Sequence, residues 1–435
     1  MLKFKHYLLI GLSLMPCSAY SSELATDLDR SAQSVEANVI AWRRDFHQHP
    51  ELSNRETRTA ARVAEHLKSL GLEVTTGIAH TGVVGILKGG KPGGIVALRA
   101  DMDALPVKEM TGLPFASTVM ADYNGKSVPV MHACGHDAHV AMLMGAASVL
   151  TAQKQHLAGT VMFIFQPAEE GAPAGEEGGA ELMLKEGLFD DIKPDAVFSL
   201  HVGPGVSGSA AYRAGAAMAA SDRFHITLTG RQTHGSMPWF GVDPITLSSQ
   251  VVLGLQTIAS RQVNLLESPA VISVGSIHGG VRHNIIPGEV TLEGTIRSFN
   301  EDQREKIHKD IKHLVEHYAT AANATAKVDI DRGYPALYNN PELIQKMLPT
   351  LKRVVGEQGV NLGPQAFGSE DFSYFANETP GFYIWLGATP DGLDPMKVAP
   401  NHSPYFIVDE KALLNGVRIY SQFAADFLNM HSLEK

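Results

Sequence analysis

Cysteine and positive charge are both scarce in this sequence of 435 residues. It contains two cysteines, Cys17 and Cys134, and 36 basic against 46 acidic residues, which gives a formal net charge of −10. Two cysteines cannot form a disulfide framework. An acidic chain without a basic run also lacks the positive surface that nucleic-acid-binding proteins use, so we expect no nucleic acid as a partner. Its 44% hydrophobic and 19% charged residues are typical of an ordinary globular protein.

Long hydrophobic runs are absent as well. Residues 1–21 have the pattern of a signal peptide, with Lys3 and Lys5 before a short apolar run and small residues where cleavage would occur. No later run approaches the roughly 18 apolar residues of a membrane span. We therefore expect an exported protein, periplasmic or secreted, without a stable membrane anchor after cleavage. A short N-terminal helix of a cytoplasmic protein is the alternative.

The first half of the chain alternates between short apolar runs and helical spacing. Strands buried on both faces are indicated at residues 83–87, 95–100, 160–165 and 196–200. Helices are indicated at residues 34–45, 54–70, 138–150 and 180–186, with Asn54 as an N-cap and Gly71 as a stop. This alternation predicts an α/β domain with a mostly parallel sheet. Ligands of such sheets bind beyond the carboxyl ends of the strands.

The pattern changes between about residues 212 and 330. Strand-like and helical segments follow one another there in the order β-α-β-β-α-β of a ferredoxin-like unit. The α/β pattern then resumes. We predict a catalytic metal-binding domain of residues 22–211 and 331–435, with an inserted α+β domain at 212–330. The edge strands of that insert need a cover or a partner, so it is a candidate lid or dimerisation domain.

Residues 131–139 concentrate the metal-binding side chains. Cys134 and His136 stand two residues apart with a glycine between them, so both can face one metal ion, which would keep the thiol deprotonated. The same stretch also reads as an ordinary helix start with a small buried cysteine, because its spacing matches no standard short zinc motif. His132 and His139 fit a structural or supporting role better than a ligand role.

Two adjacent carboxylates follow a predicted buried strand. Glu169 and Glu170 would repel each other unless a cation lay between or beside them. One could bind metal while the other acted on the bound water. A solvated acidic turn is the alternative, and it is our interpretation of Glu176 and Glu177. His201 after another predicted strand and His402 add two imidazoles. The five donors suffice for two metal ions: Cys134, His136, Glu170, His201 and His402.

The chain resembles the co-catalytic metallopeptidases and amidohydrolases, a family that includes aminoacylases, hippurate hydrolases and auxin-conjugate hydrolases. The resemblance runs from about residue 34 to 428. Its motifs lie at residues 42–51, 98–106, 132–139, 165–171, 230–238, 279–287 and 368–372. The amidohydrolase branch fits best, because Cys134 stands where other branches have a metal-bridging aspartate.

The resemblance also implies roles for individual residues. It implies the same five residues as metal ligands, with Glu169 as general base and acid and Asp103 as the residue that orients a ligand. Asp101 stands where the peptidase branches have a metal-binding histidine. The insert would form a dimer in which His234 reaches the partner's site. Two further residues would hold the substrate carboxylate or the oxyanion: Asn284 and Arg297.

We therefore predict an exported amidohydrolase that cleaves N-acyl amino acids, of the hippurate or N-acetyl-amino-acid type. Two divalent ions per subunit are expected, Mn²⁺ or Zn²⁺, with Co²⁺ and Ni²⁺ as further candidates, and a homodimer or higher oligomer. A carboxypeptidase or dipeptidase acting on short peptides is the second hypothesis. A periplasmic binding protein without turnover is the third, and the base Glu169 argues against it.

Overall fold

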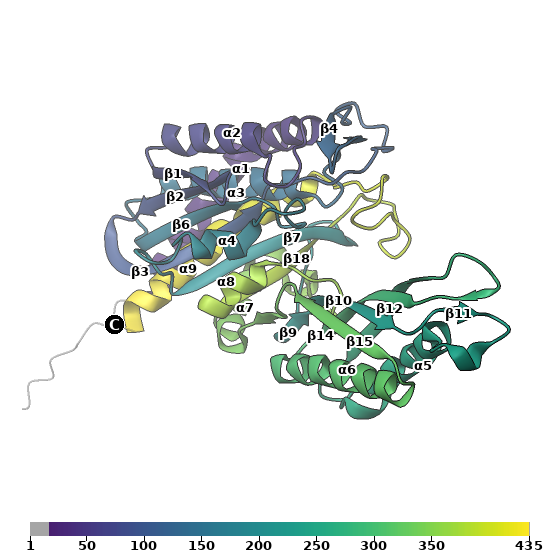
Figure 1. The fold of residues 1–435 in the computed structure, drawn as a ribbon. Coiled ribbons are helices and arrows are strands. Elements are labelled where there is room, and N and C mark those ends of the chain that lie inside the picture. Colours follow the sequence, from purple (N-terminus) through teal and green to yellow (C-terminus); the bar gives the residue numbers. More distant parts are fainter. Residues whose placement is uncertain (1–16, 435) are drawn as a thin grey trace, which may run out of the picture.

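An eight-stranded sheet forms the centre of the larger part of the molecule (Figure 1). The computed structural model describes residues 17–434, and the side chains of residues 23–431. The strand order is β1-β2-β6-β3-β7-β18-β8-β17. The four central strands, β6, β3, β7 and β18, are all parallel to one another. The strand bounds are β1 Glu73–Ile78, β2 Gly82–Lys88, β3 Lys91–Asp101, β6 Ala158–Gln166, β7 Ala196–Val206, β8 Ala210–Tyr212, β17 Val360–Leu362 and β18 Gly381–Thr389.

Helices cover both faces of this sheet (Figure 1). One apolar core joins it to α1 (Cys17–Gln48), α2 (Thr57–Ser69), α3 (His136–Ala152), α7 (Pro341–Val355) and α9 (Lys411–Glu434). A second core lies under α4 (Gly179–Lys185) and α8 (Phe372–Glu378). Burial on both faces explains why β3, β6 and β7 are continuous apolar runs rather than alternating ones. The predicted α/β fold with a mostly parallel sheet is confirmed.

A second, four-stranded sheet belongs to residues 220–332, which we call the inserted module. Its strands are β10 (Ala220–Thr229), β12 (Ala270–Gly279), β14 (Glu289–Ser298) and β15 (Thr325–Arg332), in the antiparallel order β12-β14-β10-β15. Two helices, α5 (Pro244–Thr257) and α6 (Glu301–Ala321), pack on it around a separate apolar core. The chain order is the predicted β-α-β-β-α-β. The domain boundaries at 212 and 330 stay a prediction.

Short elements complete the chain. The two linkers of the module pair with each other, since β9 (Gly215–Met218) lies antiparallel to β16 (Leu337–Asn339). Another short pair, β11 (Thr233–His234) and β13 (Ile285–Ile286), lies at the end of the module remote from the large sheet (Figure 1). The remaining elements are the hairpin β4 (Met120–Tyr123) and β5 (Lys126–Pro129), the 3₁₀ turns Pro238–Phe240 and Glu357–Gly359, and the π-helical turn Ile258–Gln262.

Three local predictions differ from the structure or lie outside it. Asn54 is not the N-cap of α2: it has a left-handed backbone (φ +61°), its side chain bonds to residues 176 and 177, and the helix begins at Thr57. His201 lies within β7 rather than after it. Residues 1–16 of the predicted signal peptide lie outside the described residues. No helix in the described part of the chain is both long and apolar enough to cross a membrane.

Candidate metal centre

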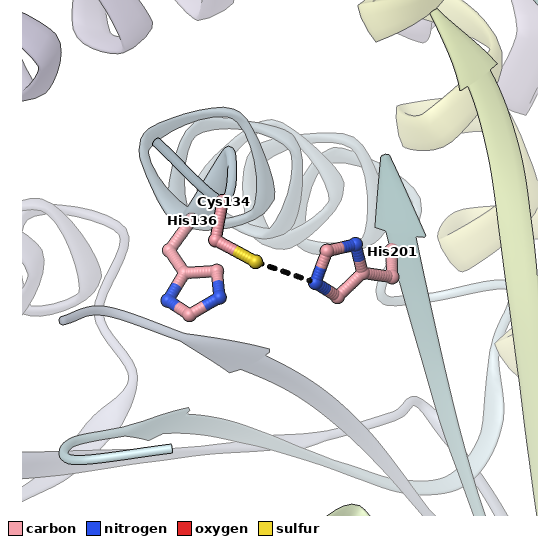
Figure 2. A group of neighbouring side chains, drawn as sticks. All are labelled: Cys134, His136 and His201. Carbon is pink, nitrogen blue, oxygen red and sulfur yellow. Dashed lines mark hydrogen bonds between the residues drawn. The ribbon is translucent and has the colours of Figure 1, made fainter. Parts of the chain in front are cut away.

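The N-terminus of α3 places Cys134 and His136 together. Gly135, between them, has φ +92°, and a Cβ atom there would lie 2.3 Å from Cγ2 of Val202. Only glycine therefore allows the chain to turn into the helix so close to β7. Both flanking side chains are buried, and Figure 2 shows them at the helix entry with His201 opposite. The glycine thus fixes the spacing of this pair.

One nitrogen of His136 is anchored and the other is free. Nδ1 lies 2.8 Å from the carbonyl oxygen of Asp103 and 3.2 Å from its Oδ1. Nε2 is buried and has no hydrogen-bond partner; it lies 3.9 Å from Oδ1 of Asp101 and 4.0 Å from Oε2 of Glu169. A histidine whose Nδ1–H is held in this way presents an Nε2 lone pair to a metal. A buried imidazole nitrogen without a partner is costly otherwise.

Cys134 and His201 form the second contact of the site (Figure 2). The Cys134 Sγ lies 3.4 Å from Nε2 of His201. The other nitrogen of His201, Nδ1, is 2.8 Å from the carbonyl oxygen of Val202, so it can donate there and leave Nε2 as an acceptor. Asn401 donates to the carbonyl oxygens of both Cys134 and Val202, at 3.0 Å each. This bridge joins the α3 entry to β7.

A turn after β6 presents the two glutamates. Ala168 has φ +52°, and Glu169 and Glu170 follow it directly. The Glu170 amide donates to Oδ2 of Asp103 at 3.0 Å, so Asp103 contacts two of the predicted ligands. The Glu170 carboxylate lies 3.0 Å from Nε2 of His402, whose amide donates to the carbonyl oxygen of Ala133. The two glutamates are thereby aimed toward the α3 entry.

The donor atoms of the predicted ligands and base form three overlapping groups, each with its atoms within 4.8 Å of one another, out of five such groups in the described part of the chain. The groups are Cys134–His136–His201, Cys134–Glu170–His402 and His136–Glu169–Glu170. The structure therefore brings together all five residues that the sequence predicts as ligands, and it places the predicted base, Glu169, next to them. One thiol, three imidazoles and a carboxylate suit a divalent transition metal.

The electrostatics of the site also fit a cation. Burial, then the carboxylates of Glu170 and Glu169, raises the pKa of the Cys134 thiol well above its usual range. Burial, followed by Glu370 and Glu170, raises the pKa of Glu169 in the same way. Burial lowers the pKa of His136, but Asp101 and Asp103 outweigh it and raise that pKa to about 10. A divalent ion would relieve this excess of negative charge and favour the thiolate.

Asp101, His139 and His132 are not free donors of the same kind. Asp101 accepts from Arg99 at Oδ2 (2.6 Å) and contacts Nδ1 of His139 at Oδ1 (2.5 Å). The other nitrogen of His139 accepts from the Val202 amide, so both of its nitrogens already have a protein partner, although His139 forms a further candidate donor group with Asp101 and His136. His132 is buried without a hydrogen-bond partner, and burial lowers its pKa to about 4. It belongs to none of the donor groups.

A buried charge network beneath the site was not predicted. Arg99 is fully buried on β3, and its guanidinium donates to Asp101, Glu370 and Asp371 and to the side chain of Gln166. It balances carboxylates that otherwise surround Glu169. The network could have been inferred from Arg99 itself, because an arginine inside the apolar run 95–100 is expected to be buried and a buried guanidinium needs acidic partners.

The predicted substrate residues lie in two different places on the module. His234, on β11, is exposed and pairs with β13, and the amide of the next residue donates to the Asn284 carbonyl at 2.8 Å. β13 comes just before the first residue of β14, Glu289, whereas Arg297 lies near the last residue of β14, where it pairs with Ser221 close to the linkers. About eight residues of extended strand separate these ends, or about 25 Å. Within one chain, His234 and Asn284 are brought together, and Arg297 is not brought to them.

Known proteins resemble this chain in sequence and in fold. Peptidase family M20/M25/M40 matches residues 97–426. A thermostable carboxypeptidase of Saccharolobus solfataricus is 40% identical over 413 residues, which are 94% of this chain and 100% of that protein. An N-acetyl-L-cysteine deacetylase of Bacillus subtilis is 36% identical over 403 residues (92% and 91%).

A solved structure agrees with these matches. It is a dinuclear metal-binding peptidase of the M20 family from Bacillus subtilis, with a TM-score of 0.75 and 31% identity, covering 91% of this chain and 99% of that one. The family match includes every predicted ligand and the base. The chain belongs to peptidase family M20/M25/M40 and is a hydrolase of amide bonds.

Proposed function

We propose that this protein is a metal-dependent amidohydrolase that releases the acyl group from N-acyl amino acids. The observation that carries the proposal is the position of Glu169, whose Oε2 lies 4.0 Å from the unpartnered Nε2 of His136. A base and a free ligand nitrogen thus share one buried site. The deacetylase relative supports the substrate class through its name.

Five residues would hold the two divalent ions: Cys134, His136, Glu170, His201 and His402. Such ions, Mn²⁺ or Zn²⁺ with Co²⁺ and Ni²⁺ as further candidates, polarise the amide carbonyl and make water more acidic. Glu169 takes the proton of the attacking water and delivers it to the leaving nitrogen. The Glu169 carboxyl group holds that proton between the two steps. Asp103 fixes the Nδ1 side of His136 and thereby its orientation.

The test is an assay of hippurate and N-acetyl-amino acids, with and without added Mn²⁺ or Zn²⁺. We expect hydrolysis that depends on the metal and is lost in Glu169→Gln. A wild-type protein that binds ligand but shows no turnover would contradict the proposal and support a binding protein.

A carboxypeptidase or dipeptidase is the second candidate, and the carboxypeptidase relative favours it. Both activities use the same base and metal centre. They differ in the acyl part of the substrate, which is a blocking group such as acetyl for an amidohydrolase and an amino acid or peptide for a carboxypeptidase or dipeptidase. Matched substrate pairs decide between them, for example N-acetyl-phenylalanine against alanyl-phenylalanine. A higher kcat/KM for the unblocked dipeptide would replace the first proposal with the second.

We also propose that the protein is a homodimer in which His234 serves the partner's site. A single N-acyl amino acid is too small to contact both ends of β14, so His234 and Arg297 of one chain cannot both bind it. The region around β11 and the nearby helix α5 exposes apolar side chains that a partner could cover: Trp239, Phe240, Ile245 and Leu253.

Mixed dimers test this arrangement. A dimer of Glu169→Gln and His234→Ala chains has one intact site if His234 acts across the interface, and none if it acts within its own chain. Equal mixing after subunit exchange should recover about a quarter of wild-type activity. No recovery, with exchange shown independently, would contradict the proposal.

Export to the periplasm or the medium is proposed from residues 1–21 alone. N-terminal sequencing of the mature protein after fractionation tests it. A cytoplasmic protein that retains Met1 or Leu2 would contradict export without affecting the proposed reaction.

A further inference from the structure

The turn that presents Glu169 and Glu170 is strained. Ala168 is buried and adopts φ +52°, a left-handed conformation that residues other than glycine and asparagine rarely adopt. An alanine has no side-chain polar group with which to stabilise that conformation. The rest of the fold must therefore hold the turn in place.

Glu56 supplies one tie to this turn. Its fully buried carboxylate accepts from the Ala168 amide at 2.9 Å and from the Asn54 amide at 3.1 Å, both at Oε1. Its other oxygen accepts from the hydroxyl of Thr81 at 2.6 Å. Glu56 comes from the segment before α2, far away in the sequence, so it pins the turn to a different part of the fold.

Tyr334 supplies the second tie. Its hydroxyl donates to the backbone carbonyl oxygen of Glu169 at 2.7 Å. Tyr334 follows β15 in the linker that returns from the inserted module, and its own carbonyl accepts from the Ser221 amide in the module. The backbone of the proposed base is thus bonded directly to the linker of the module.

We infer that Glu56 and Tyr334 are positioning residues that hold the left-handed turn at Ala168, and with it the Glu169 carboxylate, in its place above the ligand cluster. Neither residue belongs to the donor groups. Their effect on turnover rests on the proposed function, because it acts through Glu169. Their effect on the turn itself does not depend on that function.

Glu56→Ala, Glu56→Gln and Ala168→Gly test the first tie. Glu56→Ala removes the acceptor of the Ala168 amide and should lower kcat at saturating metal by about 10²-fold, with a smaller change in KM, because small misplacements of a reacting group have effects of that size. Glu56→Gln keeps an oxygen acceptor and should retain most of the activity. Adding Ala168→Gly to Glu56→Ala should recover about tenfold, since glycine adopts φ > 0 without strain.

Tyr334→Phe tests the second tie, with Tyr374→Phe as a matched control. The two tyrosine rings lie 6.1 Å apart, but the hydroxyl of Tyr374 contacts Glu181 and not the turn. We expect a fall in kcat of several-fold for Tyr334→Phe and none for Tyr374→Phe. Because both ties act on one turn, the effects of Glu56→Ala and Tyr334→Phe should not be additive.

Hydrogen exchange of the peptide spanning residues 163–171 gives a readout independent of turnover. We expect faster exchange in Glu56→Ala than in Glu56→Gln or wild type. This difference in exchange is expected whether or not the wild-type protein hydrolyses N-acyl amino acids. If the difference is found but the wild type has no such activity, the proposed function is wrong and the positioning role stands. The positioning role is overturned if folded Glu56→Ala keeps wild-type exchange and kcat. It is also overturned if Ala168→Gly recovers nothing, or if Glu56→Gln is as impaired as Glu56→Ala.

Discussion

Two of the buried clusters of histidine and carboxylate in the described residues lie at the α3 entry and in the inserted module, and they differ in an instructive way. In the module, Asp222 accepts from Arg304, His308 and the Gly333 amide, and both of its oxygens are used. At the α3 entry, Nε2 of His136 has no partner. Both clusters contain histidine and carboxylate side chains. In the module cluster the carboxylate oxygens of Asp222 have hydrogen-bond partners within the protein, whereas at the α3 entry Nε2 of His136 has none.

The pKa of Asp222 in the module is shifted in the opposite direction from those of Cys134 and Glu169 at the α3 entry. Burial raises the pKa of Asp222, but hydrogen bonds from Arg304 and His308 outweigh it and hold that pKa well below its usual range. At the α3 entry, burial and neighbouring carboxylates raise the pKa values of Cys134 and Glu169. The module cluster thus stabilises its own charges, whereas the α3 cluster needs a cation. That difference separates a structural network from a metal centre.

The largest expected effect on function comes from Glu169→Gln. Loss of the base should lower kcat for hippurate by about 10³-fold or more, because it is asked both to accept and to donate a proton. Stability should stay equal or rise, since a carboxylate crowded by others is removed. Glu177→Gln, which removes an exposed carboxylate that pairs with Lys185, is the control. Equal metal content in all three proteins must be verified by elemental analysis.

Asp222→Ala should have the largest effect on stability. Removal of one partner from a buried ion pair costs about 3–5 kcal/mol in the free energy of unfolding, measured by urea titration. Asp329→Ala, at an exposed site on β15, should change it by less than about 0.5 kcal/mol. Should Asp222→Ala abolish metal binding while the fold stays intact, the distinction between the two clusters would be wrong.

The pH dependence of that stability has a defined sign. The folded-state pKa of Asp222 lies below its unfolded value of about 3.9. Its stabilisation is therefore fully present above the unfolded pKa and is lost as the pH falls through the folded one. Wild type should lose stability faster than Asp222→Ala as the pH is lowered from 5. Parallel curves for the two proteins would show that Asp222 is not held in this way.

His234→Ala should have a smaller effect that is confined to turnover. Loss of one donor to the oxyanion lowers kcat by about 10²-fold, and stability and metal content should not change because His234 is exposed. His225→Ala, at a half-exposed histidine elsewhere on the module, serves as the control. Equal activities of the two variants would remove His234 from the proposed site.

Much of the fold can be predicted from the sequence where a hydrophobic pattern marks an element, and cannot be predicted where that pattern is missing. Continuous apolar runs such as 95–100 and 160–165 predict strands covered on both faces, and the structure has β3 and β6 there. Short edge elements such as β1 and the β4–β5 hairpin were not predicted, because their exposed side chains carry no hydrophobic pattern. Asn54 shows a similar limit, since tertiary bonds to residues 176 and 177 outweigh its capping preference.

The residues of the site also fall into those that the sequence predicts and those that only the fold shows. Cys134, His136, Glu169 and Glu170 were predicted because their chemistry is concentrated in short stretches. Partners that meet only in the folded chain, such as Glu56 with Ala168 or Arg99 with Glu370, carry no local signal. Nor does the spacing in the sequence show that His234, on β11, and Arg297, near the end of β14, lie in different places on the module.

Metal-linked stability tests the central distinction most directly. Wild type should bind about two divalent ions per chain by elemental analysis, and Zn²⁺ or Mn²⁺ at a hundred times its Kd should raise the free energy of unfolding by about 2.7 kcal/mol for each site that it fills. His136→Ala should lose most of that increase, and His308→Ala, in the module cluster, should keep it. The account is contradicted if wild type gains no stability from either ion, or if His136→Ala gains as much as His308→Ala.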